Sequence, residues 1–254
     1  MKNLKDKIVM ITGASSGIGE GCARKFAETQ AKLILVARRL DRLEKLAAEL
    51  PTQTYLIKLD VRNQADVEKA INELPDKWAD IDILINNAGL SRGLEKFHEC
   101  KISGWDEMID TNVKGLLYVS RAVTPNMVKK GSGHVINIGS IAGHEVYPGG
   151  NVYCATKHAV DAITRGMRID LSGTGVKVST VDPGLVETEF SNVRFYGDDK
   201  KANSVYNGFT PLTGEDIGET AFWVATRPDH VQIAEVIVLP SAQASATAVS
   251  RNNS

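Results

Sequence analysis

The chain has 254 residues, of which 43% are hydrophobic and 6% aromatic, proportions typical of a globular protein. Thirty basic and 31 acidic residues leave a formal net charge of −1, which gives no electrostatic reason to expect nucleic acid or a membrane surface as a partner. No apolar run is long enough to span a bilayer and no signal peptide is recognisable, so we expect a cytoplasmic protein.

Short runs of Ile, Val and Leu alternate along the chain with stretches of helical period. The runs show little polar alternation, as expected for strands of a parallel sheet that is covered on both faces. Repeated strand–helix–strand order implies right-handed crossovers. We therefore expect a single α/β domain over residues 1–254, a Rossmann-like, doubly wound parallel sheet of about seven strands with helices on both faces. The predicted strands are 7–12, 32–36, 54–59, 82–86, 134–138, 177–181 and 235–238.

Two segments depart from this alternation. Residues 187–213 form an insertion that contains charged, glycine and aromatic residues. The tail over 241–254 is small and polar, and we expect it to be flexible unless an oligomer orders it.

A glycine-rich turn follows the first predicted strand, over Thr12–Gly19. Its spacing is Gly-x-x-x-Gly-x-Gly, and it is not a P-loop because no lysine follows the last glycine. Glycines here let the backbone approach a pyrophosphate, and the following helix offers free N–H groups. An ordinary turn is the alternative, but the position between a strand and a helix favours a dinucleotide site.

Arg38 and Arg39 stand at the end of the second predicted strand, where an NAD-binding protein carries an acidic residue. Arginine gives charge-assisted bonds to a 2′-phosphate, whereas a carboxylate repels it. The alternative is that both arginines are merely solvated, but cations at a helix N-terminus oppose the helix dipole. The pair therefore favours NADP(H) over NAD(H) as the cofactor.

Tyr153 and Lys157 are four residues apart on a predicted helix and so lie on one face of it. Tyrosine titrates near pH 10 in water, about three units too high for efficient acid–base work, and a nearby ammonium lowers that pKa. Ser140, at the end of the fifth predicted strand, can steady a substrate oxygen. Each residue alone has a structural explanation, but the three together with the glycine-rich turn indicate a catalytic group.

These motifs together resemble the short-chain dehydrogenase/reductase family over nearly the whole chain. The family's glycine-rich turn is matched by Thr12–Gly19, its Asp-Val by Asp60 and Val61, and its Asn-Asn-Ala-Gly by residues 86–89. Its helix asparagine is matched by Asn112, its Ser and Tyr-x-x-x-Lys by Ser140, Tyr153 and Lys157, and its Pro-Gly-x-x-x-Thr by Pro183–Thr188.

The resemblance implies roles that spacing alone does not give. Asn86 and Gly89 would line the cofactor cleft, Thr188 would bond the nicotinamide carboxamide, and Asn112 would hold, through water, a proton path to Lys157. Alternatively, Asn86–Gly89 only shapes a turn and Asn112 only bonds a helix carbonyl. The catalytic residues implied are Asn112, Ser140, Tyr153 and Lys157. The cofactor-binding residues implied are Gly13, Ser15, Ser16, Gly17, Ile18, Gly19, Arg38, Arg39, Asp60, Val61, Asn87, Ala88, Gly89, Tyr153, Lys157, Pro183, Gly184, Val186 and Thr188.

The segment around Tyr153 and the insertion also resemble the family's NADP-dependent 3-hydroxy acid dehydrogenases, which oxidise serine and allo-threonine. Arg194 is the candidate clamp for a carboxylate or another small anion, because a guanidinium binds such groups with two hydrogen bonds. The alternative is a surface arginine paired with Asp198 or Asp199. The substrate-binding residues predicted are Ser140, Tyr147, Tyr153 and Arg194, although Tyr147 has the alternative of packing a loop.

The histidines and cysteines show no metal-ligand spacing, so we expect no metal. Apolar residues flanking the catalytic helix (Ala159, Val160, Ala162 and Ile163) favour a homotetramer or homodimer, as the resemblance implies. Three other functions stay open: a reductase of uncharged or sulfonated small aldehydes and ketones, an NADP-dependent epimerase or lyase, and an NADP-sensing protein without turnover. The joint presence of Ser140, Tyr153 and Lys157 argues against the last.

Overall fold

The computed structural model describes residues 3–252, and its centre is a sheet in which all seven strands run parallel, in the order β3-β2-β1-β4-β5-β6-β7. This confirms the predicted doubly wound, Rossmann-like domain. The strands are β1 (Ile8–Thr12), β2 (Lys32–Ala37), β3 (Thr54–Lys58), β4 (Ile83–Asn86), β5 (Gly133–Ile138), β6 (Val176–Pro183) and β7 (Glu235–Val238). β6 extends two residues past its predicted end because β7 pairs with Asp182 and Pro183 there.

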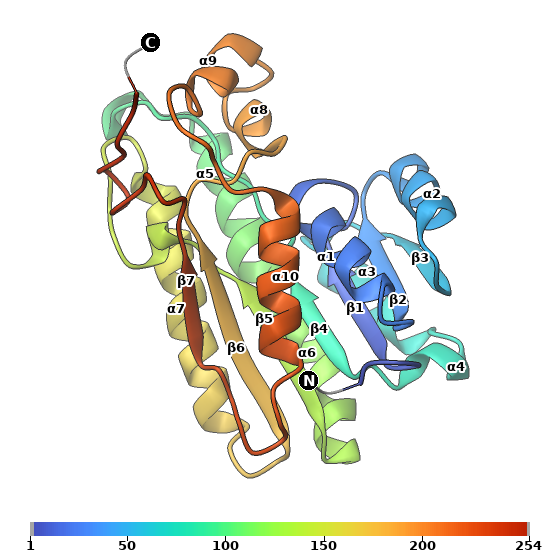
Figure 1. Cartoon of the computed structure of the whole chain (residues 1–254). Helices are drawn as coiled ribbons and strands as arrows, with labels where there is room; N and C mark the ends of the chain where they lie inside the picture. Colours follow the sequence, from blue (N-terminus) through green and yellow to red (C-terminus); the bar gives the residue numbers. More distant parts are fainter. Residues whose placement is uncertain (1–2, 253–254) are drawn as a thin grey trace.

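Helices cover both faces of the sheet (Figure 1). One face carries α1 (Gly17–Ala27), α2 (Leu40–Glu49) and α10 (Gly214–Ala225). The other carries α3 (Gln64–Asn72), α4 (Asp76–Ala79), α6 (Leu116–Lys130) and α7 (Asn151–Asp170). Within residues 3–252, no helix combines the length and the apolar character needed to cross a membrane.

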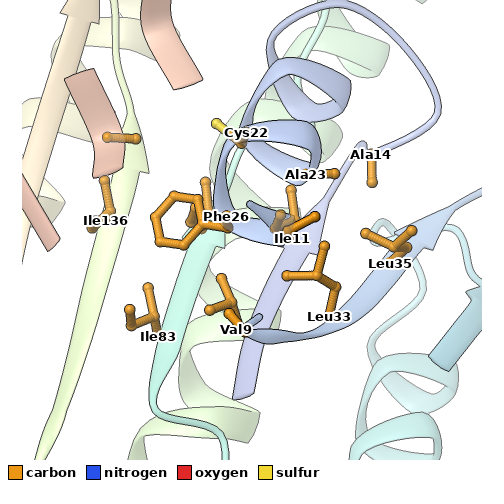
Figure 2. Close-up of a cluster of buried hydrophobic side chains, with 14 of the residues drawn as sticks. Val9, Ile11, Ala14, Cys22, Ala23, Phe26, Leu33, Leu35, Ile83 and Ile136 are labelled. Atoms are coloured by element: carbon orange, nitrogen blue, oxygen red, sulfur yellow. The ribbon is translucent and has the colours of Figure 1, made fainter. Parts of the chain in front are cut away.

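The packing of α1 on the sheet sets the position of the glycine-rich turn. Figure 2 shows Phe26 of α1 lying against Val9 and Ile11 of β1 in a fully buried cluster. Burying such an aromatic side chain stabilises the fold by roughly 1.5–3 kcal/mol. On its other side α1 meets α10 so closely that a Cβ at Gly21 would lie 2.1 Å from the carbonyl oxygen of Gly214. The N-terminus of α1 is therefore fixed at the carboxyl end of β1.

At the carboxyl edge of the sheet, α5 (Ile102–Ile109) runs into α6 through a π-helical segment, η2 (Asp110–Gly115). Asn112 lies in this widened turn and is buried. Such π-helical segments frequently occur at functional sites. Two short 3₁₀ segments, η1 (Phe97–Glu99) and η3 (Ile141–Gly143), also lie in loops of this edge.

The insertion folds into two short helices, α8 (Phe190–Arg194) and α9 (Asp199–Ser204), which stand beyond the carboxyl ends of the strands (Figure 1). The chain between them contains Tyr196, which has a positive φ of 55°. The insertion thus sits where ligands of open parallel sheets bind.

The tail departs from the expected flexibility. Its Gln243 is only 5% exposed and forms a bridge with Val249. The Gln243 side-chain oxygen accepts a hydrogen bond from the Leu185 amide at 2.9 Å, and Arg251 donates to the Val205 carbonyl at 2.9 Å. The prediction failed because these contacts form within one chain, between small polar residues and backbone groups that leave no periodic pattern.

Candidate active site

A cleft of about 620 Å³ opens along the carboxyl edge of the sheet. It brings together residues from β1, β2, β4, β5 and β6 with the insertion and the tail. All residues predicted to line the cofactor site except Gly19 and Asn86 line it, as do the predicted substrate residues. Of the four predicted catalytic residues, Ser140, Tyr153 and Lys157 line the cleft and Asn112 does not.

The glycine-rich turn has the conformation that a phosphate site requires. Gly13 and Gly17 have positive φ angles of 67° and 57°, which side chains other than glycine rarely allow. Ser16 precedes α1 in extended conformation, and its side chain does not cap the helix. The first N–H groups of α1 are therefore left for an anion at the cleft, and the dipole of the helix favours one. These residues fit the pyrophosphate of a dinucleotide.

Gly19 and Asn86 do not line the cleft, in contrast to their predicted roles. A Cβ at Gly19 would lie 2.3 Å from the Gly13 carbonyl oxygen, so this glycine serves close packing of α1 on the turn. Asn86 is buried, and its amide donates hydrogen bonds to Ser120 and Asn137, both at 2.9 Å. It therefore ties β4 to α6 and β5.

Asn87 lies at the cleft and also fastens two strands together. Its side-chain amide donates to the Thr12 carbonyl at 2.9 Å, while the Thr12 hydroxyl accepts from the amides of Asn87 and Ala88, both at 3.0 Å. The turn after β4 is thereby fixed beside the glycine-rich turn. Turn shaping and cleft lining, which the sequence left as alternatives, coincide at this residue.

The two arginines after β2 have different surroundings. Arg39 donates to the hydroxyls of Ser15 and Ser16 in the glycine-rich turn and forms a 2.9 Å salt bridge with Glu189. Arg38 lines the cleft, is exposed, and makes no hydrogen bond or salt bridge with any residue in the described range. Arg38 is therefore the guanidinium available to a 2′-phosphate.

Ser140, Tyr153 and Lys157 converge from η3 and α7. Tyr153 and Lys157 are 8% exposed each and Ser140 is 9% exposed. The Lys157 ammonium donates to the Ile138 carbonyl at 2.9 Å and lies 6.0 Å from the centre of the Tyr153 ring. Burial lowers the pKa of Lys157 to about 8, and the charge of Asp182 opposes that shift.

The electrostatics around Tyr153 differ from the expectation. Burial raises the pKa of the Tyr153 phenol, and the Arg194 guanidinium and a hydrogen bond with Ser140 oppose the rise. The sequence assigned the opposing charge to Lys157. In the structure Lys157 turns toward the Ile138 carbonyl, and the guanidinium carbon of Arg194 lies 5.3 Å from the ring centre.

Asn112 is buried behind the cleft. Its side-chain oxygen accepts from the Leu90 amide and its nitrogen donates to the Leu90 carbonyl, both at 2.8 Å. A further bond of 3.0 Å reaches the Thr156 hydroxyl on α7. Asn112 thus joins the loop after β4, the π-helical turn and the helix that carries Tyr153 and Lys157.

Arg194 lines the cleft together with Tyr147 and Tyr153 and is only 9% exposed. It donates to the Tyr147 hydroxyl at 3.2 Å and packs over the rings of Tyr153 and Phe190. Its buried Nε has no hydrogen-bond partner. No carboxylate of the described chain pairs with it, because Asp198 caps α9 and Asp199 bonds Asn192. The surface-pair alternative is therefore wrong.

Several residues that line the cleft have no motif in the sequence. The insertion contributes Glu189, Phe190 and Val193, and the tail contributes Gln243 and Ala246. Glu189 could have been predicted to line the cleft, because it is charged and directly follows Thr188. The tail residues carried no usable signal, because only folding brings them to the cleft.

Comparison with known proteins identifies a family, relatives and solved structures that are similar to this chain. A sequence model described as short chain dehydrogenase matches residues 7–197. The chain is 51% identical over 237 residues to the NADP-dependent 3-hydroxy acid dehydrogenase YdfG of Salmonella typhi, covering 93% of this chain and 96% of the relative. It is 45% identical to the NADP-dependent 3-hydroxy acid dehydrogenase of Schizosaccharomyces pombe, covering 99% of each. The closed form of serine dehydrogenase complexed with NADP+ superposes with a TM-score of 0.92, at 47% identity, over 97% of this chain and 100% of that one.

Proposed function

This chain belongs to the short chain dehydrogenase family, and we propose that it is an NADP(H)-dependent oxidoreductase that interconverts a small 3-hydroxy acid and its carbonyl form. The names of its relatives, 3-hydroxy acid dehydrogenase and serine dehydrogenase, support this substrate class. Within the class, a small polar acid such as serine or allo-threonine is consistent with the name of the serine dehydrogenase relative.

The observation that carries the substrate class is the unpaired guanidinium of Arg194. The guanidinium has the Tyr147 hydroxyl and two aromatic rings as neighbours but no carboxylate, and its buried Nε has no hydrogen-bond partner. Burying a charge without a counter-ion costs stability, which favours an anionic ligand at this position. A carboxylate on the substrate provides one, through charge-assisted hydrogen bonds to the planar guanidinium. Arg194 packs over the Tyr153 ring, so an acid bound there places its hydroxyl-bearing carbon close to the phenol.

The cofactor end of the cleft supports NADP(H). The N-terminus of α1 is suited to the pyrophosphate, and Arg38 is available for the 2′-phosphate. Asp60 and Val61, which the family resemblance assigns to the adenine, both line the cleft. Hydrogen bonds from Arg62 lower the pKa of the Asp60 carboxyl. Thr188 and Gly17 both line the cleft and lie close together. The Thr188 side chain is 3.0 Å from the position that a Cβ of Gly17 would occupy.

The residues of the chain perform the proton transfer and the positioning. The bound cofactor, when present, supplies or accepts the hydride. Tyr153 gives a proton to the carbonyl oxygen during reduction and takes one from the alcohol during oxidation. Ser140 donates a hydrogen bond to that oxygen, Lys157 supplies positive charge beneath the site, and Arg194 fixes the acid group. Asn112 holds α7 in register with the loop after β4.

The proposal is tested by following absorbance at 340 nm. L-serine, L-allo-threonine, 3-hydroxyisobutyrate and 3-hydroxypropionate are offered with NADP, and uncharged aldehydes and diketones with NADPH, each repeated with the NAD form. We expect preferred oxidation of the acids with NADP. Arg194→Leu should raise KM for the acids about 10- to 100-fold, the loss expected for a charged hydrogen bond.

Arg227→Leu, which removes an arginine at the end of α10, is the matched control and should leave KM unchanged. Equal turnover of acids by the wild type and Arg194→Leu would reject the clamp. Turnover of only the uncharged carbonyls would favour the simple carbonyl reductase. Binding of NADPH without turnover of any substrate would favour the NADP-sensing protein.

We further propose that the protein works in the cytoplasm as a homotetramer or homodimer. Large apolar side chains are exposed along α5, α6 and α7, among them Ile102 at 68% and Ile169 at 75%. Val160, one of the residues expected to take part, is 1% exposed and belongs to the core instead. Light scattering of the purified protein measures the number of subunits, and a monomeric mass would refute the proposal.

A further inference from the structure

A buried carboxylate that has no part in the proposed reaction lies directly behind the catalytic serine. Asp182, near the end of β6, is 3% exposed. Its Oδ1 accepts a hydrogen bond from the Ser140 amide at 3.2 Å and one from the Thr180 hydroxyl at 2.8 Å. A Cβ at Gly139 would lie 1.7 Å from that oxygen, so only glycine fits before Ser140. The Asp182 carboxylate therefore packs directly against the loop that carries Ser140.

The other oxygen of Asp182 is held by a histidine. Nε2 of His144, just after η3, lies 3.1 Å from Oδ2 of Asp182. Nδ1 of the same ring lies 3.8 Å from Glu235 on β7, and Glu235 in turn pairs with Arg165 of α7 at 3.3 Å. The histidine spacing in the sequence showed no such cluster, because residues 144, 182 and 235 come from three separate elements.

The arrangement is a bridge and not a metal site. His144, Asp182 and Glu235 are residue types that can bind a metal. However, the imidazole directs a different nitrogen at each carboxylate, and the ring therefore lies between them. Ligands of one ion converge on a single point. A chain of side chains instead runs from the exposed Arg165 through Glu235 and His144 to the buried Asp182.

Asp182 also acts on the catalytic lysine. Its charge opposes the effect of burial on the pKa of Lys157. Among the described residues, Asp182 is the carboxylate that acts on this lysine, whose ammonium donates its hydrogen bond to the Ile138 carbonyl. The carboxylate that holds the Ser140 backbone therefore also favours the charged form of the buried Lys157 ammonium.

We propose that Asp182, held by His144, is a positioning residue that fixes the loop carrying Ser140. The inference rests on the proposed reaction in that Ser140 and Lys157 act in it, whichever carbonyl compound is the substrate. Asp182 touches neither substrate nor cofactor and works only through these two residues.

The direction of each expected change in the pH profile of kcat follows from the charged groups around Asp182. Asp182 is faced by His144, Lys157, Glu235 and, at longer range, Arg165. Burial raises the pKa of Asp182, whereas hydrogen bonds from Thr180 and His144 oppose the rise. Removing the His144 ring should raise the pKa of Asp182 further and shift the acid limb of the kcat profile to higher pH. Removing the charge of Asp182 should lower the pKa of Lys157 below about 8 and shift the alkaline limb to lower pH.

The experiment compares Asp182→Asn, His144→Leu and His144→Gln with two controls at exposed positions of α7, His158→Gln and Asp170→Asn. Asp182→Asn should lower kcat about 10- to 100-fold, the loss typical of a displaced catalytic group, with NADPH binding unchanged. His144→Gln keeps a hydrogen-bond donor and should recover most of what His144→Leu loses. The controls should retain the wild-type kcat and pH profile.

Hydrogen exchange of the Ser140 amide provides a readout that does not depend on turnover. We expect faster exchange in both variants. Asp182→Asn replaces the charged acceptor of the Ser140 amide by a weaker neutral one, and His144→Leu leaves the Asp182 carboxylate without the imidazole that holds it. If Asp182→Asn does not fold, His144→Leu tests the same inference. His144 is only half-buried, and its loss removes the side chain that holds Asp182.

Unchanged pH limbs and unchanged amide exchange in both variants would overturn the inference. A wild-type enzyme inactive on every hydroxy acid and carbonyl would reject the proposed function, while the amide exchange would still decide whether Asp182 holds the Ser140 loop.

Discussion

Arg38 and Arg39 are adjacent, but their surroundings predict different effects on cofactor choice. Arg39 is occupied by Ser15, Ser16 and Glu189, whereas Arg38 has no bonded partner in the described part of the chain. Arg38→Ala should therefore raise KM for NADP about 10- to 100-fold and leave KM for NAD unchanged, because only NADP has the 2′-phosphate. Arg39→Ala should weaken both cofactors through the glycine-rich turn. Steady-state kinetics with both cofactors measures the difference, and equal selectivity loss in the two variants would contradict it.

At the level of residues, the sequence predicted which side chains meet but not how each is bonded. Tyr153, Ser140 and Arg194 were found because their spacing or chemistry is specific. Gly19 and Asn86 were misplaced because a motif gives position along the chain and not the direction of a side chain. Asp182 and His144 carried no local signal, since their contact depends on the end of β6 reaching η3.

At the level of elements, Glu189 connects the substrate insertion to the cofactor turn. It pairs with Arg39 at 2.9 Å and also with Arg42 on α2, and these bonds lower the pKa of its carboxyl. The bridge joins the start of α8 to α2 across the glycine-rich turn. Since the side chains are about 40% exposed, salt should weaken it.

Glu189→Gln should therefore speed release of NADPH by a few-fold, the effect expected when an exposed ion pair worth about 1 kcal/mol is lost. Stopped-flow fluorescence of bound NADPH measures the rate at low and high salt. The neighbouring Glu187→Gln, at an exposed position outside this bridge, is the control. Release from the wild type that is independent of salt and equal to that of Glu189→Gln would argue against the bridge.

The tail forms part of the cleft wall, so its loss should impair the enzyme. A chain ending at Pro240 removes Gln243, which bonds the Leu185 amide next to Gly184. We expect a higher KM for the substrate and a lower melting temperature. Gln243→Ala should reproduce part of the KM effect, whereas Gln64→Ala on α3, outside the cleft, should not. Thermal melts and kinetics of the three variants provide the comparison, and a truncated chain with wild-type kinetics would contradict the assignment.

The elements themselves followed from the sequence to different degrees. All seven strands were predicted from runs rich in Ile, Val and Leu, because a sheet covered on both faces needs such runs. The five central strands are mostly buried, whereas the edge strands β3 and β7 are largely half-buried. The short helices α8 and α9 were not predicted, since they are held by caps such as Asp198 and by contacts at the cleft. The tail has no hydrophobic pattern at all, and its position depends on hydrogen bonds to backbone groups far away in sequence.

At the level of the whole molecule, buried charges are concentrated at one edge of the sheet. Lys157, Asp182 and Arg194 are all at most 9% exposed, and all lie at the carboxyl ends of the strands. Charged side chains are ordinarily exposed, because burying a charge costs free energy of folding. Their shared location indicates that the fold gives up stability for chemistry at this edge, as functional sites commonly do.

Lys157 makes that cost measurable as a function of pH. Its pKa is about 8 in the folded protein and 10.5 for a free side chain, so between these values the unfolded chain binds more protons than the folded one. Stability contributed by this group must therefore rise with pH across that window, and the free energy of unfolding of the wild type relative to Lys157→Met should increase by about 1 kcal/mol from about pH 7.5 to about pH 9. Taking the difference between the two proteins cancels groups that titrate alike in both, such as Cys22, whose pKa burial raises to about 12. Urea unfolding at the two pH values gives the number. A difference that stays flat or falls would mean that Lys157 keeps its ordinary pKa in the folded protein, and that the ammonium behind Tyr153 is better solvated than its burial indicates.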